Sequence, residues 1–174
     1  MEKRAGSGEW IRRLAEGDTS VLEEIYDASA ERLFGHALWV TRNPQDAEDI
    51  VHDVIVKLAG MGGDAARIRN LDGYLFQMAH RAALQLLRSR EWRAQHPVDP
   101  ALFIVDGSDP ATQAQIAQTE RLVGELALEQ REAVYLHLYE GLTFREIGRV
   151  TGVSTFTAAS RYRLAMRRLR KGTS

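Results

Sequence analysis

Apolar side chains recur every three or four positions along most of the chain, with charged side chains between them. Residues 20–40, 45–59 and about 72–93 each follow this pattern. The period is that of one face of an α-helix and differs from the strict alternation of a half-buried strand. Pro44 separates the first two segments, because proline lacks an amide donor and disfavours helical backbone in its predecessor. The pattern therefore predicts an all-α fold.

A proline-rich stretch divides the helical pattern into two halves. Residues 96–111 contain three of the four prolines together with aspartate and glycine. This composition favours an extended connector over a packed helix. We therefore predict two small helical domains, residues 1–95 and 112–174, joined by a flexible linker. The second domain should begin with helices near 112–126 and 129–139.

Helix start and stop signals follow one another closely in the last part of the chain. Thr143 and Glu146 have the spacing of a capping box, so a short helix should start at Thr143. Gly152 can adopt the left-handed conformation that ends it, and Ser154 is a good N-cap for a second helix to about Arg170. Two helices joined by such a turn describe a helix-turn-helix, whose second helix enters the major groove of DNA. The alternative is a basic surface helix that ends an ordinary bundle.

The period of that second helix separates an inner from an outer face. Steps of four, three and four residues place one set inward: Ala158, Tyr162, Ala165 and Leu169. The polar set faces outward or flanks the core: Thr157, Ser160, Arg161, Arg163 and Arg167. Hydroxyl and guanidinium groups bind phosphate oxygens and base edges, so the polar set is a candidate DNA-binding surface.

The formal net charge of −1 conceals a separation of charge along the chain. Residues 1–60 hold seven Lys or Arg against twelve Asp or Glu, whereas residues 147–174 hold seven basic residues and no acid. An acidic front and a basic tail indicate two different kinds of partner. A pair of solvated helix faces is the alternative that charge alone leaves open.

The predicted helix 45–59 carries an acidic side opposite its apolar stripe. Four polar residues cluster there at helical spacing: Glu48, Asp49, His52 and Asp53. Carboxylates this close on a helix repel one another. The face is therefore either simply solvated or made for a basic partner.

The predicted helix 72–93 ends in a basic segment with aromatic residues nearby. The arginines are Arg81, Arg88, Arg90 and Arg93, and the aromatic residues are Tyr74, Phe76 and Trp92. This combination suits unpaired DNA, because any base can stack on an aromatic ring. Aromatic residues at helical spacing are also common in cores, so Tyr74 and Phe76 have a second interpretation.

Motifs of enzymes, metal sites and membrane proteins are missing from the sequence. There is no cysteine, the five histidines show no HExxH spacing, and Gly60-Met61-Gly62-Gly63 lacks the lysine of a phosphate loop. No serine lies in a nucleophile elbow. No apolar run is long enough for a membrane span or a signal peptide. We expect a cytoplasmic protein without enzymatic activity, metal, cofactor or membrane insertion.

Five ordered motifs over residues 10–171 resemble the extracytoplasmic-function sigma factors of bacterial RNA polymerase. The motifs are Asp46-Ala47-Glu48-Asp49-Ile50-Val51-His52-Asp53, Gly73-Tyr74-Leu75-Phe76-Gln77-Met78-Ala79-His80-Arg81, Gln130-Arg131-Glu132-Ala133-Val134, Glu140-Gly141-Leu142-Thr143-Phe144-Arg145-Glu146-Ile147-Gly148, and Thr151-Gly152-Val153-Ser154 with Ala159-Ser160-Arg161-Tyr162-Arg163. Each motif alone is weak, but their order is specific.

The resemblance implies a promoter-melting domain, a linker and a domain that reads the upstream promoter element. It implies that the acidic face binds the clamp helices of the largest subunit of core RNA polymerase, and that the flap of the second-largest subunit and an anti-sigma factor are further partners. Residues 67–72 would approximate the loop that captures a flipped base. The DNA-binding residues that follow from the resemblance and the helix faces are Arg81, Gln85, Arg88, His137, Arg145, Thr157, Ser160, Arg161, Arg163 and Arg167.

Two other functions are also consistent with the sequence. A stand-alone helix-turn-helix regulator would use the acidic first domain for dimerisation or sensing and would bind DNA without polymerase. A sigma-like mimic would bind an anti-sigma factor and lack promoter activity. Ala159 and Leu164 stand where basic residues are common in the family, so the promoter sequence is not implied by the resemblance.

Overall fold

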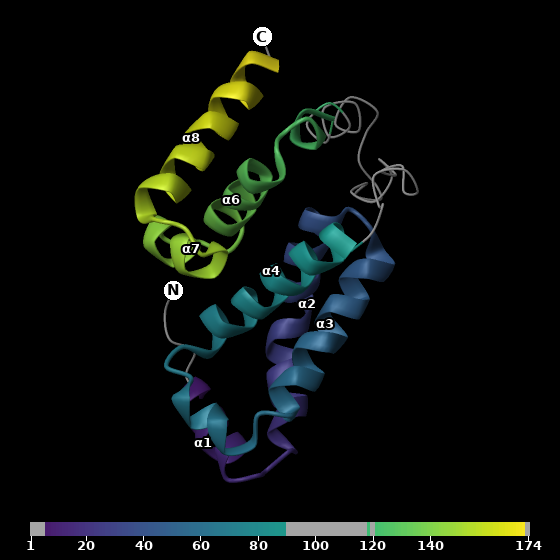
Figure 1. Ribbon diagram of the computed structural model, residues 1–174, viewed down its shortest axis with the longest axis vertical. Helices are drawn as coiled ribbons and strands as arrows, with labels where there is room; N and C mark the ends of the chain where they lie inside the picture. The colour runs from purple at the N-terminus through teal and green to yellow at the C-terminus, as the bar shows by residue number, and fades with distance from the viewer. Residues whose placement is uncertain (1–5, 90–117, 119–120, 173–174) are drawn as a thin grey trace, which may run out of the picture.

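The computed structural model is built from helices (Figure 1). It describes residues 6–89, 118 and 121–172. The elements in order are α1 (Ser7–Ala15), α2 (Val21–Thr41), α3 (Pro44–Ala59), the 3-10 helix η1 (Gly62–Arg67), α4 (Leu71–Ser89), α6 (Leu128–Leu138), α7 (Phe144–Thr151) and α8 (Thr155–Gly172). Residues 121–124 are also helical. No strand occurs within these residues, and the predicted all-α class is confirmed.

The first half is a three-helix bundle of α2, α3 and α4, with α1 and η1 packed at one end. The side chain of Asn43 caps α3 by accepting a hydrogen bond from the Asp46 amide at 3.0 Å, and Pro44 occupies the first turn. This start agrees with the predicted break at Pro44. The apolar stripe of α3 is buried in the bundle, and it consists of Ala47, Ile50, Val51, Val54 and Leu58.

Two elements of the first half, α1 and η1, were not predicted. Only nine residues long, α1 completes too few turns for its apolar residues Trp10, Ile11 and Leu14 to establish a period. The helix packs against η1 and α2, and its Leu14 is 2% exposed. Tertiary packing rather than local pattern therefore stabilises this helix.

The helix-turn-helix forms as the capping signals predicted. Thr143 Oγ1 accepts a hydrogen bond from the Glu146 amide at 3.3 Å, and Glu146 Oε2 accepts one from the Thr143 amide at 2.9 Å. Gly152 ends α7 in the left-handed conformation with φ of 73°, and Ser154 Oγ accepts a hydrogen bond from the Thr157 amide at 3.0 Å. The predicted inner face of α8 packs against α6 and α7, with Ala158 and Ala165 fully buried.

The two halves pack directly on each other, an arrangement that was not predicted from the sequence. Helix α2 contacts α6, and α4 contacts α7 (Figure 1). One hydrophobic cluster runs through both halves, since Tyr135, Leu136 and Leu142 join the core residues of α1 to α4. At Gly35 the helix backbone lies so close to the Tyr135 hydroxyl that a Cβ atom would overlap it. The glycine thus allows the close approach of α2 and α6.

Several predictions concern residues outside those that the structure describes. They include the linker 96–111, the helix start near 112, and the side chains of Arg90, Trp92 and Arg93. The domain boundaries at 95 and 112 stay predictions. In the described part of the chain, no helix is both long and apolar enough to cross a membrane.

Candidate nucleic-acid and polymerase interfaces

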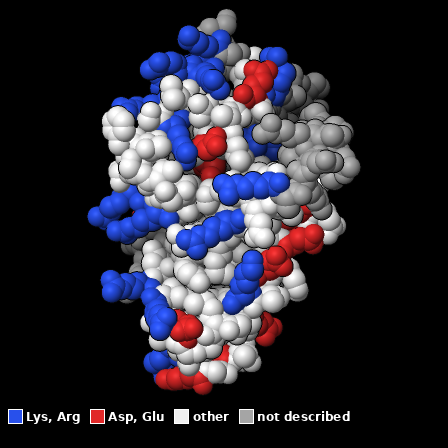
Figure 2. Space-filling model, viewed as in Figure 1, with Lys and Arg blue, Asp and Glu red and all other residues white. Residues whose placement is uncertain are grey.

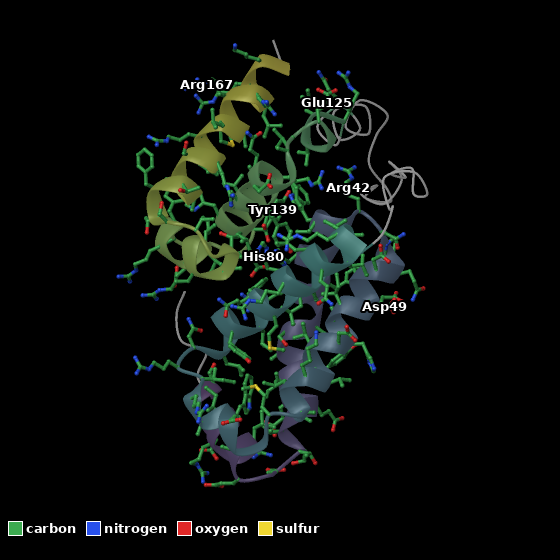
Figure 3. The ribbon with its side chains drawn as sticks, viewed as in Figure 1. Arg42, Asp49, His80, Glu125, Tyr139 and Arg167 are labelled. Atoms are coloured by element: carbon green, nitrogen blue, oxygen red, sulfur yellow. The ribbon has the colours of Figure 1, made fainter. Side chains whose placement is uncertain are left out.

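The acidic face of α3, formed by Glu48, Asp49, His52 and Asp53, is fully on the surface. All four side chains are exposed, and Figure 3 shows Asp49 pointing away from the bundle. Asp49 accepts a long hydrogen bond of 3.5 Å from Gln45 on the same helix. Among the described residues, no cationic side chain pairs with Glu48 or Asp53. The face is available to a basic partner because it faces away from the core shared by the two halves.

Helix α4 presents a second polar surface, formed by Arg81, Gln85 and Arg88. Steps of four and three residues place these side chains on one face. All three are exposed, and together with Leu84 they line a shallow hollow. Phe76, in contrast, is 1% exposed and packs edge-on to His36, so the core interpretation is correct for this ring.

The segment 67–72 lies where the two halves meet. Arg67, Arg69 and Asn70 line a cavity that α7 closes from the other side with Arg149 and Val150. Gln77 of α4 donates a hydrogen bond to the Arg149 carbonyl at 3.0 Å beside this cavity. The segment that the resemblance assigns to a flipped base is therefore partly covered by the helix-turn-helix.

The outer side of α8 is strongly basic. Arg163 and Arg167 are exposed, and Figure 3 shows Arg167 extending from the outer edge of the helix. Thr157, Ser160 and Arg161 are half-buried. Basic side chains line the upper and left edges of the molecule, where α8 and α7 lie (Figure 2). This surface has the charge that phosphate binding needs.

Arg145 and His137 have different surroundings. Arg145 is exposed on the first turn of α7. His137 is half-buried, and its Nδ1 lies 2.8 Å from the Leu142 carbonyl oxygen. Its ring contacts the rings of Phe144 and Tyr162 at centroid distances of 4.5 and 4.7 Å. The His137 ring joins α6 to α7 and α8, which leaves only Nε2 for a phosphate.

A buried ionic cluster joins the halves, and sequence reasoning missed it. The Glu132 carboxylate of α6 is 2% exposed, and its Oε1 lies 2.9 Å from His36 Nε2 and 2.7 Å from His80 Nδ1. Burial opposes ionisation of Glu132, but hydrogen bonds from His36 and His80 outweigh it and lower its pKa to about 2. These contacts span 96 and 52 residues, so no local spacing could reveal them.

Two further polar contacts join the halves around this cluster. Arg32 of α2 pairs with Glu140 beyond α6 at 2.7 Å, and both side chains are largely buried. The indole of Trp39 donates a hydrogen bond to the Arg131 carbonyl at 2.8 Å. Hydrogen bonds thus add to the packing of the interface, whereas the buried Nδ1 of His36 and Nε of Arg131 have no hydrogen-bond partner among the described residues.

Two family profiles match this chain, one in each half. The family profile "Sigma-70 region 2" matches residues 25–93, and "Sigma-70, region 4" matches residues 116–169. These two regions define a class, the sigma-70-type initiation factors. A relative in Mycobacterium tuberculosis, the ECF RNA polymerase sigma factor SigK, is 30% identical over 168 residues, which cover 92% of this chain and 89% of the relative. The SigK of Mycobacterium sp. strain KMS is 28% identical over 92% of this chain and 86% of its own.

Solved structures share the fold at low sequence identity. Sigma factor RpoE of Bartonella quintana, in complex with the anti-sigma factor NepR, has a TM-score of 0.72 at 20% identity and covers 87% of this chain and 95% of its own. CnrH, in complex with the cytosolic domain of CnrY, has a TM-score of 0.70 at 18% identity and covers 95% of this chain and 96% of its own. The chain belongs to the ECF sigma factor family. It is an alternative sigma factor, an initiation factor that binds core RNA polymerase and directs it to promoters.

Proposed function

We propose that the acidic face of α3 binds the clamp helices of the largest polymerase subunit. The proposal is supported by four exposed polar side chains, three of them carboxylates, that face away from the core. Opposite charges across an interface guide association and fix its orientation. The flap of the second-largest subunit would bind the second half of the chain.

The DNA contacts are proposed for two surfaces on different halves. Arg81, Gln85 and Arg88 on α4 would hold the minus-ten element while its strands separate. The outer side of α8, with Thr157, Ser160, Arg161, Arg163 and Arg167, would enter the major groove of the upstream element. Arg145 and His137 would contact flanking phosphates. The observation that carries this proposal is a capped helix-turn-helix whose basic second helix is open to solvent, in a chain whose acidic helix is equally open.

An anti-sigma factor is proposed as the regulating partner. The support comes from RpoE and CnrH, whose structures contain NepR and CnrY. Residues 1–95 and 112–174 would be the two functional domains, with 96–111 as linker. We further propose that the chain has no catalytic activity of its own and acts in the cytoplasm, where polymerase and promoters meet.

Reconstitution with core polymerase tests this function. The chain, purified core enzyme and a genomic promoter library should together yield transcripts from a defined subset of promoters. Failure to bind the core enzyme would contradict the proposal. Tight promoter binding by the chain alone would favour a stand-alone regulator, and tight anti-sigma binding without transcription would favour a sigma-like mimic.

A further inference from the structure

Phe156, in the first turn of α8, is unusually exposed for an aromatic side chain. At 75% it has the largest exposed fraction of any large hydrophobic residue that the structure describes. An aromatic ring is normally buried because water contact with apolar surface is unfavourable. The first turn of the second helix in a helix-turn-helix is also the part that faces base edges. The exposed ring therefore lies at the position where sequence is read.

The surroundings of Phe156 indicate what kind of surface it contacts. The Arg163 guanidinium carbon lies 5.9 Å from the ring centroid, a cation–π distance. Residues 156, 160 and 163 follow steps of four and three and share one face of the helix. The helix carries six basic residues and no acid. An exposed ring beside an arginine on a basic helix does not fit an apolar protein groove, but it fits DNA, which supplies phosphates around a few apolar groups.

The major groove offers one prominent apolar group, the C5-methyl of thymine. We propose that Phe156 is a specificity-determining residue that reads a thymine in the upstream promoter element through contact with this methyl group. The ring also holds the Arg163 side chain beside it, so that the guanidinium is positioned for the adjacent base or phosphate. This inference rests on the proposed role of α8 in promoter binding and specifies one base, a thymine, that the helix recognises.

Deoxyuridine provides the test, because it pairs as thymine does and lacks only the methyl group. A promoter recovered from the library by holoenzyme is prepared with each upstream thymine replaced by deoxyuridine, one position at a time. Wild-type holoenzyme should lose about fourfold in affinity at one position, the effect of one apolar carbon contact. Phe156→Ala should bind the thymine promoter more weakly and lose the sensitivity to deoxyuridine at that position. Phe156→Leu should retain part of the binding affinity for the thymine promoter and part of the sensitivity to deoxyuridine.

Leu164→Ala is the matched control, since Leu164 is another exposed apolar residue of α8. It should keep the wild-type response to deoxyuridine. The inference is overturned if no position is sensitive in the wild type, or if Phe156→Ala leaves the sensitivity unchanged and weakens binding to core polymerase or an anti-sigma factor instead. In both cases, promoter-specific transcription by the wild-type holoenzyme still supports the proposed sigma function. If the wild-type holoenzyme produced no promoter-specific transcript, the result would contradict both the proposed function and this inference.

Discussion

The Glu132 carboxylate on α6 lies 2.7 Å from Nδ1 of His80 on α4, inside the interface between the two halves (Figure 3). The same oxygen lies 2.9 Å from His36 Nε2 on α2. One buried carboxylate therefore joins three helices that come from both ends of the sequence. Loss of one partner from such a cluster leaves buried polar groups without hydrogen bonds, which is strongly destabilising.

Glu132→Gln should make the protein less stable at neutral pH, by about 3 kcal/mol. The folded-state pKa of Glu132 is about 2 and the ordinary value is 4.5, so the carboxylate stabilises the fold above pH 4.5 and this contribution is lost as the pH falls towards 2. Urea unfolding from pH 7 to pH 3 should show the difference between wild type and variant shrinking as the pH falls. Glu125→Gln, at an exposed residue, is the control and should change stability little. A difference that is independent of pH would contradict the assignment.

Gly35→Ala should separate or strain the halves, because the new Cβ overlaps the Tyr135 hydroxyl. We expect a loss of about 1–3 kcal/mol, typical of overpacking a core. Thermal unfolding measures the loss, and small-angle X-ray scattering shows whether the molecule expands. Adding Tyr135→Phe removes the hydroxyl and should restore much of the stability. Gly8→Ala, a helical site with open space around it, should be neutral or stabilising, and an equal loss there would remove the steric explanation.

Reversal of charge on the acidic face should weaken binding to core polymerase while leaving the fold intact. The double variant Glu48→Lys with Asp53→Lys should lower the affinity at least about tenfold, an effect that decreases with added salt. Fluorescence anisotropy of a labelled chain measures the affinity, and circular dichroism verifies the helix content. Glu23→Lys, an exposed acid on α2, controls for a general change of charge. If the double variant and this control bind equally well, the docking face lies elsewhere.

Arg163→Ala should reduce promoter binding by about 1–3 kcal/mol if the guanidinium contacts a base. Arg167→Ala should weaken binding to all DNA sequences and reduce the salt dependence, as expected for a phosphate contact. Competition between the cognate promoter and unrelated DNA, at several salt concentrations, separates the two cases. If Arg163→Ala lowered the affinity for the cognate promoter and for unrelated DNA equally, Arg163 would be a second phosphate contact.

The sequence alone determined the helix-turn-helix and the acidic face. Thr143, Glu146, Gly152 and Ser154 act on backbone groups within three or four residues, so their effect is readable locally. The outward position of Asp53 followed in the same way from the apolar stripe of its helix. The sequence motifs also identified the family, which the comparisons confirmed.

Only the tertiary structure decided how the two halves meet. Glu132 and its histidine partners are far apart in the chain, and nothing in their local sequence distinguishes a buried histidine from an exposed one. Phe76 and Phe156 both lie on helices, yet one is 1% and the other 75% exposed. Periodicity gives the face on which a residue lies but not what covers that face. That depends on contacts between distant segments, which form only when the chain folds.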